Sequence, residues 1–109
     1  MKKRKAFSIS ISDLDKINGK FNDQFEVGRA LKAFFETEYK KGNFKISYKL
    51  PYFNHLELRT QKNVFLEEEI LEKYNKFVQD KYGLEKQKEI DNLLSQIFTS
   101  LAHEFANNL

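Results

Sequence analysis

Side chains that can bind phosphate or hydrogen-bond to nucleic-acid bases gather in one stretch of the sequence, residues 44–60, FKISYKLPYFNHLELRT. Its polar positions include Lys45, Ser47, Lys49, His55 and Arg59. Apolar residues alternate with them. Because successive side chains of a strand point to opposite faces, the pattern predicts two strands with one apolar and one mostly basic face. Pro51 and Asn54 are typical turn residues and favour a hairpin.

The basic face of this expected hairpin has the chemistry for binding duplex DNA. A two-stranded ribbon fits a groove of the duplex, and lysines such as Lys45 and Lys49 would hold phosphates. Arg59 and Asn54 can hydrogen-bond to base edges. We expect further contacts from an N-terminal arm, from the preceding helix and from positions around the hairpin. The full set of expected DNA-binding residues is Lys3, Arg4, Lys5, Arg29, Lys32, Lys41, Lys45, Ser47, Lys49, Tyr52, Asn54, His55, Arg59 and Lys62.

The charge distribution favours the same interpretation. The formal net charge is only +3, but positive charge is concentrated in two stretches. Residues 1–5 hold four basic residues and no acid, and residues 40–62 hold six basic residues and one acid. The remainder of the chain is acidic. This asymmetry is typical of a protein that binds a polyanion with one face, although lysines that protect an exposed sheet edge would also produce it.

Few residues are suited to catalysis or to metal binding. The sequence has no cysteine and only two histidines, His55 and His103, in different predicted elements. It has no phosphate-binding glycine loop and no metalloprotease histidine pair, and metal sites need several ligands together. We therefore expect no metal, no cofactor and no enzymatic activity. One alternative stays open, a small basic RNase in which His55 acts beside Lys49 and Arg59, with Tyr52 near the phosphate.

The other predicted elements must hold the hairpin rigid. Strict alternation in residues 7–12, FSISIS, predicts a half-buried strand. Residues 12–41 are predicted to form two helices with a very short turn between them. Apolar residues at helical spacing predict two more helices, over residues 64–82 and 84–107.

The order strand, helix, helix, ribbon resembles that of a winged helix-turn-helix domain. The resemblance implies an α+β fold, a winged helix-turn-helix with two additional C-terminal helices, in a single domain of residues 1–109. Within it, residues 1–6 form a basic flexible tail, residues 44–60 the wing hairpin and residues 64–107 the C-terminal helices. The helix from Asp23 to Lys41 takes the recognition position, but its acidic residues make it a weaker DNA contact than the wing.

The small size and the Lys- and Asn-rich composition are similar to those of plasmid or phage proteins. Among these, the chain resembles small relaxosome accessory proteins of conjugative plasmids, which bind the origin of transfer. The resemblance covers residues 7–60 by element order. It implies sequence-specific binding of double-stranded DNA, with no chemistry of its own, by a homodimer. A relaxase or another DNA-processing protein is a candidate partner.

Other functions are compatible with the same residues. In a ribbon-helix-helix repressor, residues 7–11 would pair with their copy across a dimer and contact the major groove. A winged-helix transcriptional repressor and an inhibitor of a nucleic-acid enzyme are further alternatives. The broad apolar stripe of residues 84–107 suggests a two-fold dimer through the last two helices. Nothing approaches the ~18 apolar residues of a membrane span, so we expect a cytoplasmic protein without membrane association.

Overall fold

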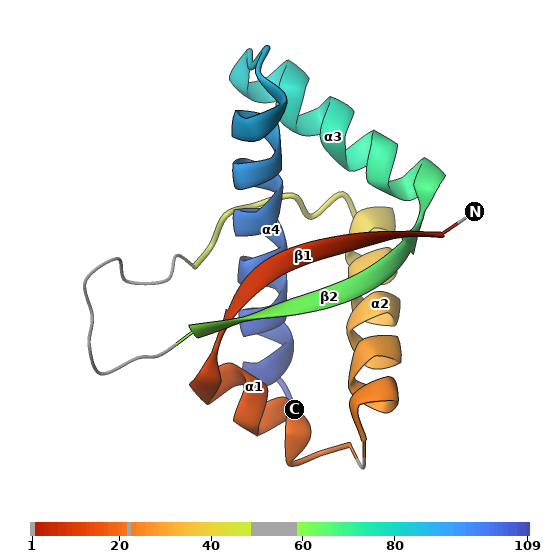
Figure 1. Cartoon of the computed structure of the whole chain (residues 1–109), viewed down its shortest axis with the longest axis vertical. Helices are drawn as coiled ribbons and strands as arrows, with labels where there is room; N and C mark the ends of the chain where they lie inside the picture. Colours follow the sequence, from red (N-terminus) through yellow and green to blue (C-terminus); the bar gives the residue numbers. More distant parts are fainter. Residues whose placement is uncertain (1, 22, 49–58) are drawn as a thin grey trace.

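The computed structural model of the protein describes residues 2–21, 23–48 and 59–109, apart from the side chain of Gln24. These residues form an α+β fold with a two-stranded antiparallel sheet and four helices (Figure 1). The elements in chain order are β1 (Lys2–Ser10), α1 (Ile11–Asn18), α2 (Gln24–Lys40), β2 (Arg59–Glu67), α3 (Glu68–Tyr82) and α4 (Gln87–Asn107).

Strands β1 and β2 form a ribbon that lies across α2 and α4 (Figure 1). Their register pairs Lys2 with Glu67 and Ser10 with Arg59. Phe7 and Ile9 of β1 point to the helices and are buried, as are Val64 and Leu66 of β2. The alternation that predicted a strand at residues 7–12 therefore buries one face of residues 7–10, whereas residues 11 and 12 belong to α1.

The ribbon corrects two expectations about where elements begin. Residues 1–6 were expected to form a flexible tail, but Lys2 to Lys5 belong to β1 and pair with residues 64–67 of β2. A helix was expected from residue 64, but β2 continues to Glu67 and α3 begins at Glu68. The apolar residues of 64–66 fit both the helical period and the period of a strand. The long-range pairing with β1 makes this segment a strand.

The expected wing is also corrected in its first half. The backbone of residues 43–48 forms no strand. It runs along α4 instead, where the Ser100 hydroxyl accepts from the Tyr48 N–H at 3.1 Å and donates to the Tyr48 carbonyl at 2.9 Å. These bonds replace the ladder that a hairpin partner would supply. Residues 49–58, which include the expected tip, lie outside the described residues, and Arg59 belongs to β2.

Local sequence chemistry explains the helix ends. Asp23 caps α2 as its side chain accepts from the Glu26 N–H, and Ser10 does the same for the Asp13 N–H at α1. Gly42 follows α2 with a φ of 74°, in the left-handed region that glycine adopts without a Cβ penalty. The turn residues thus place the helices even though the strands were misassigned.

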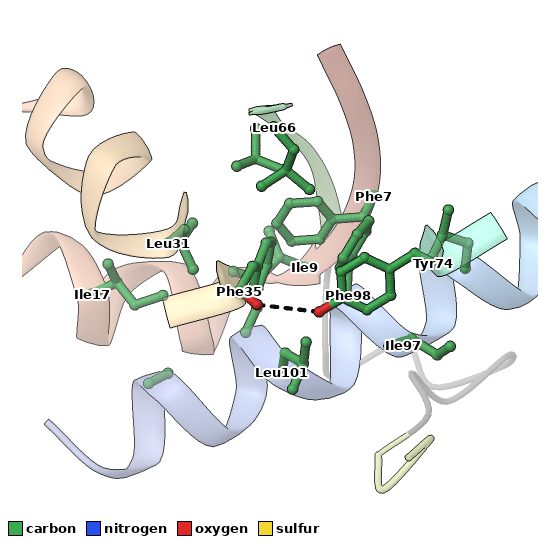
Figure 2. Close-up of a cluster of buried hydrophobic side chains, with 14 of the residues drawn as sticks. Phe7, Ile9, Ile17, Leu31, Phe35, Leu66, Tyr74, Ile97, Phe98 and Leu101 are labelled. Carbon is green, nitrogen blue, oxygen red and sulfur yellow. Dashed lines mark hydrogen bonds between the residues drawn. The ribbon is translucent and has the colours of Figure 1, made fainter. Parts of the chain in front are cut away.

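The core lies between the ribbon and the helices and is centred on aromatic rings (Figure 2). Phe35 of α2 stacks on Phe98 of α4 with 4.8 Å between ring centroids, and Phe7 packs edge-on against Phe35 at 5.5 Å. Tyr74 of α3 meets Phe98 at 5.0 Å. The apolar stripe of α4 is used in this core: Ile90, Leu94, Ile97, Phe98 and Leu101 are all buried within one chain.

Helix α4 also covers one edge of the ribbon. The Ser95 hydroxyl donates to the Ala6 carbonyl at 3.4 Å, and the Thr99 hydroxyl donates to the Ser8 carbonyl at 2.6 Å. The peptide groups of Ala6 and Ser8 therefore point away from β2 and toward α4. This part of β1 is occupied on both edges, so it cannot pair with its own copy as a ribbon-helix-helix protein requires.

Tyr74 gives a pH-dependent test of the core. It is fully buried and donates to the Phe35 carbonyl at 3.2 Å (Figure 2). Burial raises the pKa of Tyr74 well above the ordinary 10.0, with smaller contributions from Glu38 and Tyr39. Above that ordinary value the unfolded chain loses this proton while the folded chain keeps it. Stability therefore falls as pH rises.

We expect Tyr74→Phe to cost about 1 kcal/mol near neutral pH, because one hydrogen bond is lost. The same change should make the loss of stability between about pH 9 and pH 11 less steep. Urea unfolding over this range measures both effects. Tyr82→Phe is the control, because Tyr82 is 40% exposed and should leave the slope unchanged. Equal slopes in Tyr74→Phe and the parent protein would contradict the assignment.

Candidate functional site

The outward face of the ribbon carries side chains with the chemistry sought in the sequence. Residues of β1 with even numbers and residues of β2 with odd numbers point away from the buried face. No described helix lies over this face (Figure 1). The outward residues are Lys2, Arg4, Ala6 and Ser8 of β1, and Arg59, Gln61, Asn63, Phe65 and Glu67 of β2.

The register places this outward face in a definite order. Ser8 lies opposite Gln61, Ala6 opposite Asn63 and Arg4 opposite Phe65. Opposite side chains of an antiparallel pair are about 5 Å apart, so these groups form two adjacent rows. A guanidinium lies toward each end, with hydroxyl and amide groups between them. Arg4, Arg59, Gln61 and Asn63 are exposed.

The three expected basic residues of the N-terminal arm separate in the structure. Lys3 forms an ion pair with Glu68 at 2.9 Å, which raises the pKa of Lys3. Lys5 is half-buried and donates to the Asp91 carbonyl at 3.4 Å, and burial lowers its pKa although Asp91 opposes this. Only Arg4 points outward from the ribbon. One of the three expected contacts therefore lies on the candidate face.

The described residues of the first half of the expected wing lie on a segment other than the ribbon that holds Arg59. Lys45 is exposed on the segment beside α4. Ser47 donates to a Glu104 carboxylate oxygen at 2.8 Å, and Lys41 lies 3.8 Å from a Glu38 carboxylate oxygen. These positions belong to segments other than the ribbon. The other expected residues of the hairpin lie outside the described residues: Lys49, Tyr52, Asn54 and His55.

Three more expected DNA contacts meet at a different place, a groove between α2 and β2. Arg29 and Lys32 come from α2 and Lys62 from β2, and Lys2 completes a cationic rim. The groove has a volume of about 350 Å³. Its walls are apolar: they include Val64, Gly28 and the exposed rings of Phe25 and Phe65. The sequence did not predict that these cations surround a common apolar hollow.

The second histidine forms a structural contact rather than part of an active-site cluster. The Nδ1 atom of His103 lies 2.9 Å from Oδ2 of Asp13, whose side chain is buried. The Tyr48 ring stacks on His103 with 3.7 Å between centroids. The contact joins α1, α4 and the segment after α2, so it holds the fold together. Among residues 2–21, 23–48 and 59–109, no group of three or more potential metal ligands occurs.

Comparisons with known proteins were made for the whole chain. No family model, curated protein or solved structure matches it. The candidate site is therefore interpreted from its own geometry. None of the described helices is long and apolar enough to span a bilayer.

Sequence reasoning missed the amide residues of the site. Gln61 and Asn63 lie in a stretch that was taken as the link between the wing and a helix. The alternation of Asn63, Val64, Phe65 and Leu66 was a sign of a strand, but it is too short to exclude a helix. The register with β1 was also needed, because it decides which residues share a face with Arg4.

The contact between His103 and Asp13 predicts a stability effect. We expect His103→Ala to destabilise the fold by about 1–3 kcal/mol, because the buried Asp13 carboxylate loses its partner. Chemical denaturation measures this cost. Replacing Asp13 with Asn in the His103→Ala background should recover part of it, since a neutral amide is less costly to bury than an unpaired charge. An unchanged denaturation midpoint in His103→Ala would contradict this role.

Proposed function

We propose that this protein binds double-stranded DNA in a sequence-specific manner through the outward face of the β1–β2 ribbon. The observation that carries the proposal is the row of exposed arginine and amide side chains on an uncovered two-stranded ribbon. These are the groups that discriminate base pairs in the major groove: Arg pairs with guanine, and Asn and Gln pair with adenine. The major groove is also wide enough to admit a two-stranded ribbon.

Charge supports duplex binding at this face. Arg4 and Arg59 lie toward opposite ends of the ribbon on the same face, which suits contacts with phosphates or guanines across the groove. The acid on this face, Glu67, lies directly opposite Lys2, so the net charge of the face is positive. The buried face of the ribbon rests on the aromatic core, which fixes its orientation. A rigid ribbon loses little conformational entropy when it binds.

This proposal changes the expected winged helix-turn-helix arrangement. The strand that follows α2 along the described chain is β2, and its partner is β1 rather than the other half of a wing hairpin. We therefore place DNA contact on the β1–β2 ribbon, which includes Arg59, and not on the segment of Lys45 and Ser47. Service as an accessory factor at a conjugative origin of transfer, and action as a homodimer, are parts of the same proposal. They rest on the resemblance alone.

The ribbon and the expected wing make different predictions about salt dependence. We expect Arg4→Ala and Arg59→Ala each to weaken duplex binding and to reduce the slope of log K against log salt by ~0.9, because one fewer phosphate is neutralised. Fluorescence anisotropy with a duplex selected from a random library measures the slope. If either arginine contacts only a base, its main effect will be on sequence preference instead.

Lys45→Ala is the matched control, since Lys45 is exposed and was expected to contact DNA from the wing. We expect binding by Lys45→Ala to equal that of the parent protein. Loss of affinity in Lys45→Ala, with Arg4→Ala and Arg59→Ala unaffected, would return the contact to the expected wing segment that contains Lys45. No duplex binding by the folded parent protein at low salt would reject the proposed function.

The amides test specificity separately from affinity. We expect Gln61→Ala and Asn63→Ala to reduce discrimination against a mismatched site by about 1–3 kcal/mol each, the range measured for good bidentate pairs. Binding to random duplex and the salt slope should stay as in the parent protein, because no phosphate contact is removed. Competition between selected and random duplexes measures the ratio. Equal ratios in variant and parent would exclude base contacts by these amides.

A further inference from the structure

The groove between α2 and β2 lies along the free edge of the ribbon. The peptide groups of Ala6 and Ser8 point away from β2, toward α4. Residues directly opposite in an antiparallel pair orient their peptide groups alike, either both inward or both outward. Asn63, opposite Ala6, and Gln61, opposite Ser8, therefore point their N–H and C=O groups away from β1. By the same alternation, the N–H and C=O groups of Phe65 also point away from β1.

This edge has hydrogen-bonding groups without partners in the described protein. Among the described residues, no backbone bond outside regular helices and strands involves Gln61, Asn63 or Phe65. The edge of β1 is covered by hydroxyls of α4, so the two edges of the ribbon differ. An open strand edge is a template for a further strand. Peptide-binding domains use such an edge when an extended segment adds to a sheet.

The groove beside this edge has an apolar lining that could contact the side chains of an added strand. Phe25 is 80% exposed and Phe65 is 55% exposed, and both line the groove. Large apolar rings so exposed at one hollow mark an interaction surface. Val64 and Gly28 add to the apolar lining of the groove.

Gly28 is unexplained by the fold itself. It lies inside α2, where glycine costs about 1 kcal/mol relative to alanine. A Cβ at this position would meet no atom within 4 Å, so no described part of the protein needs the space. Because Gly28 has no side chain, however, the groove stays open beside this part of α2. A partner that approaches α2 closely accounts for a glycine here.

The cations of the groove define the charge of the partner. The neighbouring Lys32 ammonium lowers the pKa of Lys2, and burial lowers it further, while Glu67 and Glu36 act in the opposite direction. Burial also lowers the pKa of Lys62. Lys32 lies 3.7 Å from a Glu36 carboxylate oxygen. Like charges that crowd a partly dehydrated hollow are relieved by an incoming carboxylate.

From these observations we propose that the groove binds an extended acidic peptide segment of a partner protein, which adds as a third strand to the edge of β2. Its backbone bonds to Gln61, Asn63 and Phe65, its apolar side chains contact Phe25 and Val64, and its carboxylates meet the cationic rim. This site shares Lys2, Asn63 and Phe65 with the outward face that we assign to DNA, but its evidence does not depend on that assignment.

Two other occupants fit the geometry less well. A second copy of this chain would bring another set of four cations to the same groove, so repulsion opposes a dimer through this edge. Single-stranded nucleic acid could stack on the phenylalanines and pair with the cations. It would leave the strand edge unused, because bases and sugars do not continue a β-ladder. The open edge therefore favours a peptide.

In the experiment, the full chain is titrated with the terminally blocked peptide Glu-Val-Glu-Phe-Glu-Val-Glu. Two-dimensional NMR monitors binding. We expect saturable shifts at the groove and slowed hydrogen exchange of the N–H groups of Gln61, Asn63 and Phe65. The N–H groups of Ala6 and Ser8, on the other strand, should be unaffected. A peptide of the same pattern with Lys in place of Glu should not bind.

Two pairs of variants separate binding from folding. Gly28→Leu adds a side chain at a position where a Cβ meets no atom within 4 Å, and it should abolish binding, while Ala33→Leu places the same side chain on an exposed position of α2 and should not. Lys32→Glu should weaken binding by about tenfold or more through charge reversal. Lys76→Glu, on exposed α3, should leave it unchanged.

Three outcomes would overturn the proposal. The first is no binding of the acidic peptide by the folded protein, or binding that Gly28→Leu leaves intact. The second is protection of the same N–H groups in the protein alone with dependence on its concentration, which would assign the edge to a second copy. The third is binding of oligothymidine in the groove with these N–H groups unprotected, which would assign it to single-stranded nucleic acid. Arg4→Ala and Arg59→Ala should retain peptide binding, so failure of the DNA proposal is distinguishable.

Discussion

The pairing of β1 with β2 is the constraint on which the rest of the structure depends. It joins residues that are far apart in sequence, since Lys2 pairs with Glu67. The pairing turns a stretch of four consecutive basic residues into part of a ladder whose side chains alternate between faces. It also brings Phe7 and Ile9 beside Val64 and Leu66, and these four residues cover the aromatic core on the side of the ribbon. Neither strand could bury an apolar face alone.

The same pairing sorts the charges of the N-terminal strand by their position. Side chains with odd numbers turn toward the helices, where Lys3 pairs with Glu68 and Lys5 donates to the Asp91 carbonyl of α4. Side chains with even numbers turn outward, so Arg4 shares a face with the amides of β2. A run of like charges is therefore divided between structural contacts and an open surface. Charge density along the sequence could not show this division.

How much could be predicted from the sequence follows from the range of the interactions involved. Residues 7–12 were predicted as a strand, and the four helices were predicted near their observed positions, because periodicity and capping act within a few residues. The partner of β1 could not be derived, since the choice between a hairpin and a long-range pair depends on the whole core. Without the partner strand, the register of β1 could not be predicted either.

The candidate site shows the same limit more sharply. Arg4 and Arg59 were expected as DNA contacts from residue type alone, but Gln61 and Asn63 could be identified only once the face of β2 was known. Arg29, Lys32 and Lys62 were expected as separate DNA contacts, and their common groove depends on how α2 crosses beside β2. Residue chemistry is local, whereas the sharing of a surface is a property of tertiary structure.

The two surfaces proposed for the protein are joined through one strand. β2 directs the side chains of Gln61 and Asn63 toward the outward face and the peptide groups of the same residues toward its open edge. An acidic strand on that edge would place carboxylates beside Arg59 and widen the ribbon from two strands to three. Both changes oppose entry into the major groove, because the added charge repels phosphate and the added strand increases the width. Binding at either surface would then weaken binding at the other by the same factor, as thermodynamic linkage requires.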